Sequence, residues 1–88
     1  MIINIKDLKN KIIYRANYRG TKEMDKLLSS FTKKYVDQLN KDELNLLCDL
    51  LNHDDENLYR FNQGQNVTIK IEVNKITELF KNYTYVNE

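Results

Sequence analysis

Apolar residues recur at helical spacing along most of this chain. The clearest stripe lies between Gly20 and Tyr35 and consists of Met24, Leu27, Leu28, Phe31 and Tyr35. Positions three and four apart share one face of an α-helix, so these side chains form one apolar surface. The pattern predicts an amphipathic helix from about Gly20 to Tyr35 with this surface in the core.

Three further segments have the features of helices. A first helix is expected from about Lys6 to Asn17, with an apolar line of Ile5, Leu8, Ile12 and Ala16. A third is expected to start at Asn40, which can cap it, and to run to Leu51. Leucines cover most of its circumference, which predicts the most buried helix, with Cys48 as a small core residue. Asp54 as N-cap predicts a short fourth helix through Phe61.

The segment from Val67 to Val73 gives conflicting signals. Its apolar residues alternate with polar ones, which is typical of a strand. However, helical spacing is also kept by Ile69, Val73, Ile76, Phe80 and Tyr83. Because a lone strand would have no partner in an otherwise helical chain, we expect a helix here. The fold class expected is all-α, a small bundle of about five short helices in one domain, 1–88.

Gly20 is expected to begin the second helix. With no Pro and only two Gly in the chain, the breaks between helices must come from polar caps. As an N-cap with ordinary backbone angles, Gly20 would place Glu23 at the third helical position, where its carboxylate reaches free backbone N–H groups. Capping explains Gly20 and Glu23 but leaves Arg19 unexplained.

The net charge of +1 conceals an uneven distribution. From Met1 to Lys41 there are ten Lys/Arg and four Asp/Glu, net +6, and from Asp42 to Glu88 four and nine, net −5. The basic half suits a surface that docks an acidic partner, although a solvated lysine face explains it equally well. The single cysteine indicates a reducing compartment, and no apolar stretch approaches the roughly 20 residues that cross a bilayer. We expect a cytoplasmic protein without membrane insertion and see no export signal.

No catalytic or metal-binding pattern is recognisable. The chain has one His and one Cys, no Gly-rich phosphate loop and no separated pair of carboxylates suited to acid–base chemistry. His53 stands beside acidic residues, but helix capping explains those acids, and further metal ligands are missing. The sequence therefore predicts an interaction domain that is not an enzyme and holds no metal.

Two motifs stand out in the chain. The first is Arg19-Gly20-x-x-Glu23-x-Asp25, followed by Leu28, Phe31 and Tyr35; the second is Leu50-Leu51-Asn52-His53-Asp54-Asp55 with Leu58-Tyr59. Together they resemble the succinate dehydrogenase assembly factor family, the SdhE-type flavinylation factors. Their order, spacing and helical context carry the resemblance across about Ile12 to Gly64. Position 18 departs from it, since Tyr18 stands where the family often has a second Arg.

The resemblance implies a factor that binds the flavoprotein subunit of succinate dehydrogenase, and of fumarate reductase as a further possibility. It would promote covalent attachment of FAD to that subunit while binding no cofactor itself. Arg19, Gly20 and Glu23 would contact the partner, with Asp25 in support. A eukaryotic member would work in the mitochondrial matrix, although no transit peptide is seen. We expect a monomer.

Two alternatives from other classes remain open. The basic first half could serve a helical nucleic-acid-binding module, although no recognisable nucleic-acid-binding module is present. An enzyme subunit or redox protein would instead use Cys48 or His53 as its active group. Steep loss of affinity with rising salt would indicate the first alternative. Loss of activity on replacing Cys48 would indicate the second.

Overall fold

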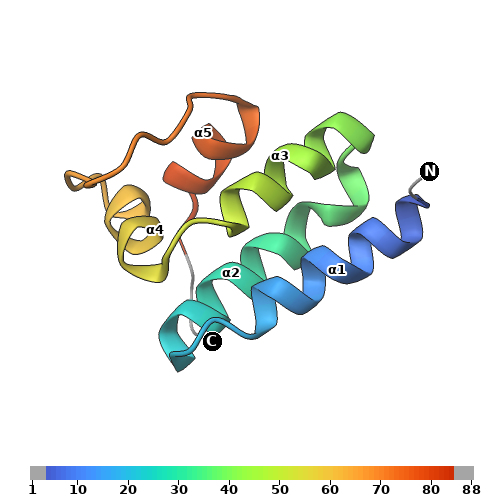
Figure 1. Cartoon of the computed structure of the whole chain (residues 1–88), viewed down its shortest axis with the longest axis horizontal. Helices are drawn as coiled ribbons and strands as arrows, with labels where there is room; N and C mark the ends of the chain where they lie inside the picture. The colour runs from blue at the N-terminus through green and yellow to red at the C-terminus, as the bar shows by residue number, and fades with distance from the viewer. Residues whose placement is uncertain (1–3, 85–88) are drawn as a thin grey trace.

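Five α-helices and one 3₁₀ turn make up the fold in the computed structural model, which describes residues 4–84. In chain order they are α1 (Ile5–Asn17), α2 (Lys22–Tyr35), η1 (Val36–Gln38), α3 (Lys41–Leu51), α4 (Asp55–Asn62) and α5 (Lys75–Lys81). Helix α1 packs against α2 and α3, and α5 packs against α3 and α4 (Figure 1). The expected all-α bundle is therefore confirmed.

The core follows the apolar stripes of the sequence. Helix α2 buries Met24, Leu27, Leu28 and Phe31, and α3 buries Leu44, Leu47, Leu50 and Leu51. Cys48 packs against this core but is only partly buried. Ile5, which was expected on the apolar line of α1, is the first residue of that helix and is 46% exposed. The apolar line of α1 begins instead at Leu8.

Phe31 joins α2 to the C-terminal part of the chain through an aromatic cluster. Its ring centroid lies 5.1 Å from that of Tyr35, 5.2 Å from that of Phe80 and 5.3 Å from that of Tyr83. Two of these pairs are edge-on, a geometry that the charge distribution of aromatic rings favours. The short helix α5 is thereby fixed to α2, and the hydroxyl of Tyr83 donates to Ser30 Oγ at 2.9 Å.

Polar caps mark every helix start, as the shortage of Gly and Pro requires. Asn40 and Glu43 form a capping box at α3, and Asp54 caps α4 by accepting from the backbone N–H of Asn57. Asn74 and Thr77 form a second box at α5. The predicted caps Asn40 and Asp54 are confirmed, whereas the box at α5 was not foreseen.

The expected helix over Val67 to Val73 is wrong. Residues 65–74 contain neither helix nor strand, and α5 begins only at Lys75. The capping box at Asn74 starts the helix there, and Val73 just before it is 80% exposed. Of the residues that suggested a longer helix, Ile76 and Phe80 are fully buried and Ile69 and Val73 are exposed.

The aromatic cluster should dominate stability. Replacing the 1%-exposed Phe31 by Ala removes its contacts with three rings, and large core aromatics cost about 3–5 kcal/mol when truncated. Tyr14, which is 66% exposed, is the matched control, and its replacement by Ala should change stability by about 0.5 kcal/mol or less. Urea unfolding measures both free energies of unfolding. Equal losses in the two variants would contradict the assigned core.

Candidate functional site

Arg19 points into the molecule and links two interhelical corners. It lies in the α1–α2 corner, Tyr18–Thr21, and its side chain is 11% exposed. Nε donates to Asp55 Oδ1 at 2.8 Å, Nη1 donates to the Leu51 carbonyl at 2.7 Å, and Nη2 donates to the His53 carbonyl at 2.7 Å. Every nitrogen of the guanidinium is therefore engaged by the α3–α4 corner.

These contacts suit an arginine for physical reasons. The carbonyls of Leu51 and His53 lie at the carboxyl end of α3, where the last carbonyls of a helix lack partners and attract positive charge. Asp55 supplies the countercharge from the first turn of α4. Only the planar fork of a guanidinium reaches all three acceptors at once, which a lysine ammonium would not.

Asp25 holds the same corner from the other side. Its Oδ1 accepts a hydrogen bond from the backbone N–H of Arg19 at 2.5 Å. Asp25 sits in the first turn of α2, where the helix dipole favours a carboxylate. The structure thus brings Arg19 and Asp25 of the first motif together with Asp55 of the second.

Gly20 adopts a backbone conformation that side chains oppose. Its φ is +112°, so the expectation of ordinary backbone angles is wrong. The N-cap is Thr21, whose hydroxyl accepts from the backbone N–H of Met24 at 3.2 Å, and the predicted N-cap at Gly20 is therefore one residue early. Glu23 consequently stands at the second helical position. The reason is local: Thr21 offers a capping oxygen in an extended conformation, and Gly20 supplies the turn before it.

Space around Gly20 is not the constraint. A Cβ built there would meet Asp55 Oδ2 at 3.8 Å, an ordinary contact distance. Gly20 itself is exposed, so the corner presents bare backbone at this one position, between the exposed residues Tyr18 and Thr21. A partner can approach this backbone closely, provided that the inner side of the corner stays fixed by Arg19.

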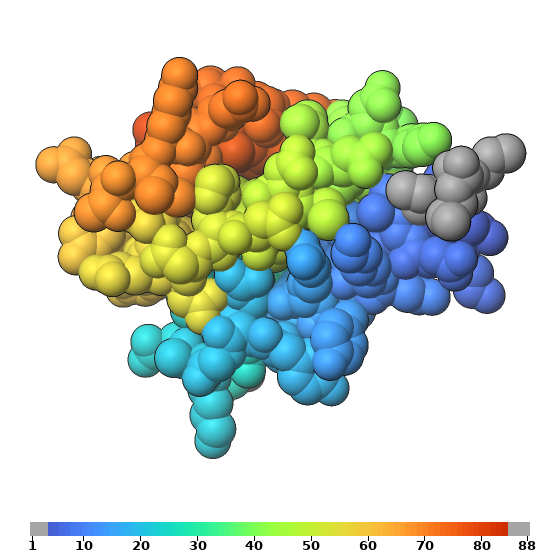
Figure 2. All heavy atoms as spheres, in the orientation of Figure 1, coloured from blue at the N-terminus to red at the C-terminus, as the bar shows by residue number. Residues whose placement is uncertain are grey.

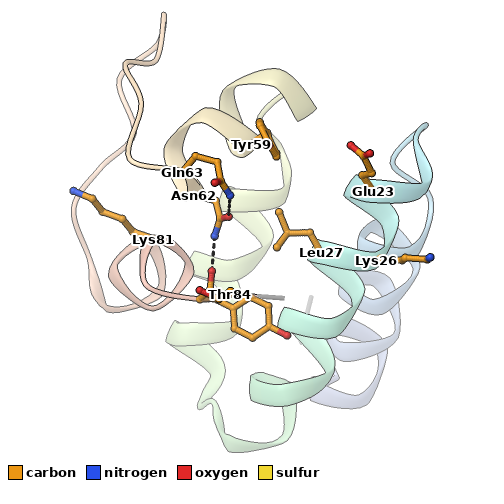
Figure 3. A pocket seen from close by; sticks show the side chains of 9 residues that line it. Glu23, Lys26, Leu27, Tyr59, Asn62, Gln63, Lys81 and Thr84 are labelled. Atoms are coloured by element: carbon orange, nitrogen blue, oxygen red, sulfur yellow. Dashed lines mark hydrogen bonds between the residues drawn. The ribbon is translucent and has the colours of Figure 1, made fainter. Parts of the chain in front are cut away.

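Glu23 faces outward beside two hollows. It lines a pocket of about 540 Å³ formed by α2, α4 and the residues after α5 (Figure 3). It also lines a smaller hollow of about 250 Å³ that includes Thr21, Asp55 and Tyr59. Tyr59 lines both hollows and is 45% exposed. Glu23 and Tyr59 therefore both line the two hollows.

The floor of the larger pocket is rigid. Asn62 is 8% exposed, and its amide nitrogen donates to the carbonyls of Phe80 and Tyr83 at 2.7 and 2.8 Å. Lys26 and Lys81 stand on the walls and Leu27 adds an apolar patch (Figure 3). The pocket thus combines an apolar contact, a tyrosine ring and charges of both signs, which suits the side chains of a protein partner.

Sequence reasoning missed Asp55 and Tyr59 as site residues. Both occur in the second motif, but Asp55 was explained by the helix dipole alone, and Tyr59 had no assigned role. The sequence signal that could have identified them is the occurrence of the two motifs together. Arg19 and Asp55 lie 36 positions apart and meet only in the folded chain.

The pKa values of two carboxylates near helix starts are lowered. The side-chain hydrogen bond from Asn57 lowers the pKa of Asp54, and the hydrogen bond from Lys75 lowers the pKa of Glu43. Both carboxylates belong to caps of α3 and α4 and serve the fold. Within residues 4–84 no cluster of His, Cys, Asp and Glu is arranged to hold a metal ion, and no helix is long and apolar enough to cross a membrane.

Comparison with known proteins identifies the family. The sequence model of the Sdh5 family, described as flavinator of succinate dehydrogenase, matches residues 10–84. This chain belongs to that family of succinate dehydrogenase assembly factors. It is 41% identical over 49 residues to "Succinate dehydrogenase assembly factor 2, mitochondrial" of Saccharomyces cerevisiae, in strains YJM789, RM11-1a and S288c. The match covers 56% of this chain and 30% of the yeast proteins. No solved structure gives a significant match.

The positive φ of Gly20 leads to a stability prediction. Gly20→Ala should destabilise the fold by about 1–2 kcal/mol, because alanine resists a left-handed conformation that glycine adopts freely. Gly64, with φ +72° and nothing near its missing Cβ, is the matched control outside the site, and Gly64→Ala should cost a similar amount. Thermal unfolding of both variants checks this. A Gly20→Ala protein more stable than the parent would show that the corner has ordinary backbone angles.

Proposed function

We propose that this chain binds the flavoprotein subunit of succinate dehydrogenase and promotes covalent attachment of FAD to it. The family match over residues 10–84 supports the assembly role. The resemblance extends this proposal to the flavoprotein of fumarate reductase. The chain acts as a binding factor, and the reacting flavin and histidine belong to the partner.

One observation carries the proposal. Arg19 and Asp25 fix the α1–α2 corner from inside, and this leaves Gly20 and Glu23 exposed on its outer surface. A glycine that exposes its backbone beside a carboxylate and a pocket is suited to close, oriented contact with another protein. We therefore assign Gly20 and Glu23 to direct contact with the flavoprotein. Arg19 and Asp25, also expected to bind the partner, contribute by holding that surface in place.

Such a factor accelerates a reaction by positioning. A docked surface that holds the partner's flavin and histidine in reacting geometry converts a rare arrangement into a persistent one. Glu23 adds a fixed negative charge at the contact, and fixed charges stabilise developing charge more effectively than mobile water does. The chain itself needs neither a bound cofactor nor a nucleophile for this role.

Glu23→Gln tests the contact with little disturbance of the fold. Glu23 is exposed and makes no ion pair with any residue in 4–84, so removing its charge should leave the unfolding midpoint nearly unchanged. The rate of FAD attachment to the purified flavoprotein should fall about tenfold, equivalent to about 1.4 kcal/mol. Covalent flavin is measured by its fluorescence in a denaturing gel.

Glu78→Gln is the matched control, because Glu78 is an exposed glutamate in the first turn of α5 and lines neither hollow. It should flavinylate its partner at the parent rate. Equal rates for the parent and Glu23→Gln would remove Glu23 from the contact. Binding measured at increasing salt separates the nucleic-acid alternative, since a phosphate-binding protein would lose affinity for DNA or RNA steeply.

A further inference from the structure

The connection between α4 and α5 has the sequence of a strand but forms none. Apolar and polar residues alternate from Val67 to Val73, and the segment lies on the outer surface (Figure 2, upper left). Ile69 is 38% exposed and Val73 is 80% exposed. Neither the core nor the proposed docking site uses these side chains.

The backbone of this segment is satisfied along one edge only. The N–H of Thr68 donates to Asn57 Oδ1 at 2.9 Å, and the carbonyl of Glu72 accepts from Thr77 Oγ1 at 2.8 Å. In an extended chain the backbone groups of alternate residues point to opposite edges. Thr68 and Glu72 are therefore tied to their own chain, whereas the backbone groups of Lys70, between them, make no hydrogen bond within residues 4–84. The backbone groups of Ile69, Ile71 and Val73 make no hydrogen bond within residues 4–84 and belong to the opposite edge.

The segment Ile69-Lys70-Ile71-Glu72-Val73 is complementary to itself when two copies run antiparallel about Ile71. Lys70 then lies opposite Glu72 of the other copy on one face, and Ile69 lies opposite Val73 on the other face. Aliphatic pairs and opposite charges at directly facing positions stabilise antiparallel strands. Moving the centre to Lys70 opposes two lysines, and moving it to Glu72 opposes two glutamates. Of the registers centred on Lys70, Ile71 and Glu72, the one about Ile71 alone matches both faces without facing like charges.

We propose that residues 69–73 pair with the same residues of a second copy of this chain, forming a two-stranded antiparallel ribbon across a two-fold axis. The same patch serves both partners, as a two-fold interface requires. An isolated two-stranded ribbon is marginal in water, so the association is weak and depends on concentration. The segment lies at the top of Figure 1 and the α1–α2 corner at the bottom, so pairing leaves the proposed flavoprotein contact open. The monomer expected from the sequence is then the form of the protein at low concentration.

Charge exchange tests the pairing in the full chain. Lys70→Glu and Glu72→Lys each place like charges opposite one another at both cross-strand positions. Each variant alone should therefore raise the dimer dissociation constant about tenfold or more. An equimolar mixture of the two variants should dimerise like the parent, because every new charge then faces an opposite one. Sedimentation velocity from micromolar to millimolar concentration measures the dimer.

The control is Lys81→Glu, which changes an exposed lysine of α5 outside the segment and should dimerise like the parent. Far-UV circular dichroism verifies that all variants keep their helices. In the dimer, amide exchange should slow at Ile69, Ile71 and Val73 and stay fast at Lys70. A parent chain that stays monomeric up to millimolar concentration would overturn the proposal. So would a mixture that associates no better than its two components.

Discussion

The guanidinium of Arg19 is the interaction on which the site depends. It crosses from the α1–α2 corner to the α3–α4 corner and satisfies two carbonyls and a carboxylate there. The carbonyls and Asp55 would otherwise be partly buried without a partner, and Arg19 would be a desolvated charge. Breaking such a pair by removing one member costs more than the pair contributes, since the other member is left uncompensated. The link therefore maintains a fixed geometry for Gly20 on the outside of the corner.

In this arrangement, the residues of one short motif have two different roles. Arg19 and Asp25 have their polar groups turned toward the fold, while Gly20 and Glu23 have theirs toward solvent. A bundle of this size has a limited core, so its surface loops need specific ties to stay rigid. The aromatic cluster around Phe31 provides one such tie for α5, and Arg19 provides another for the corners. A rigid outer surface loses less entropy on binding, which is an advantage for the positioning role that we propose.

The helices and most of the core could be predicted because their causes are local. Leu27, Leu28 and Phe31 follow helical spacing, and the cap at Asn40 carries its own signature. The role of Arg19 could not be predicted, because its acceptors lie more than 30 positions away and exist only after folding. The start of α5 was missed because Ile69 and Val73 match two periodicities at once. The left-handed conformation of Gly20 was missed because both threonine and glycine are common N-cap residues, so the sequence did not decide between Gly20 and Thr21. The sequence identified the motif residues but did not show which of their side chains point into the fold and which point to solvent.

The division of labour at the corner is tested most directly by comparing Arg19→Ala with the parent in two measurements, urea unfolding and flavoprotein binding. The account predicts that Arg19→Ala lowers the free energy of unfolding by about 3 kcal/mol, as expected for a partly buried pair that loses one member. Binding to the flavoprotein should weaken. The two corners should also become less ordered, which faster amide exchange in residues 18–21 and 52–55 would show. An Arg19→Ala protein with parental stability and parental exchange that nevertheless fails to bind the flavoprotein would contradict the account, because Arg19 would then act on the partner directly.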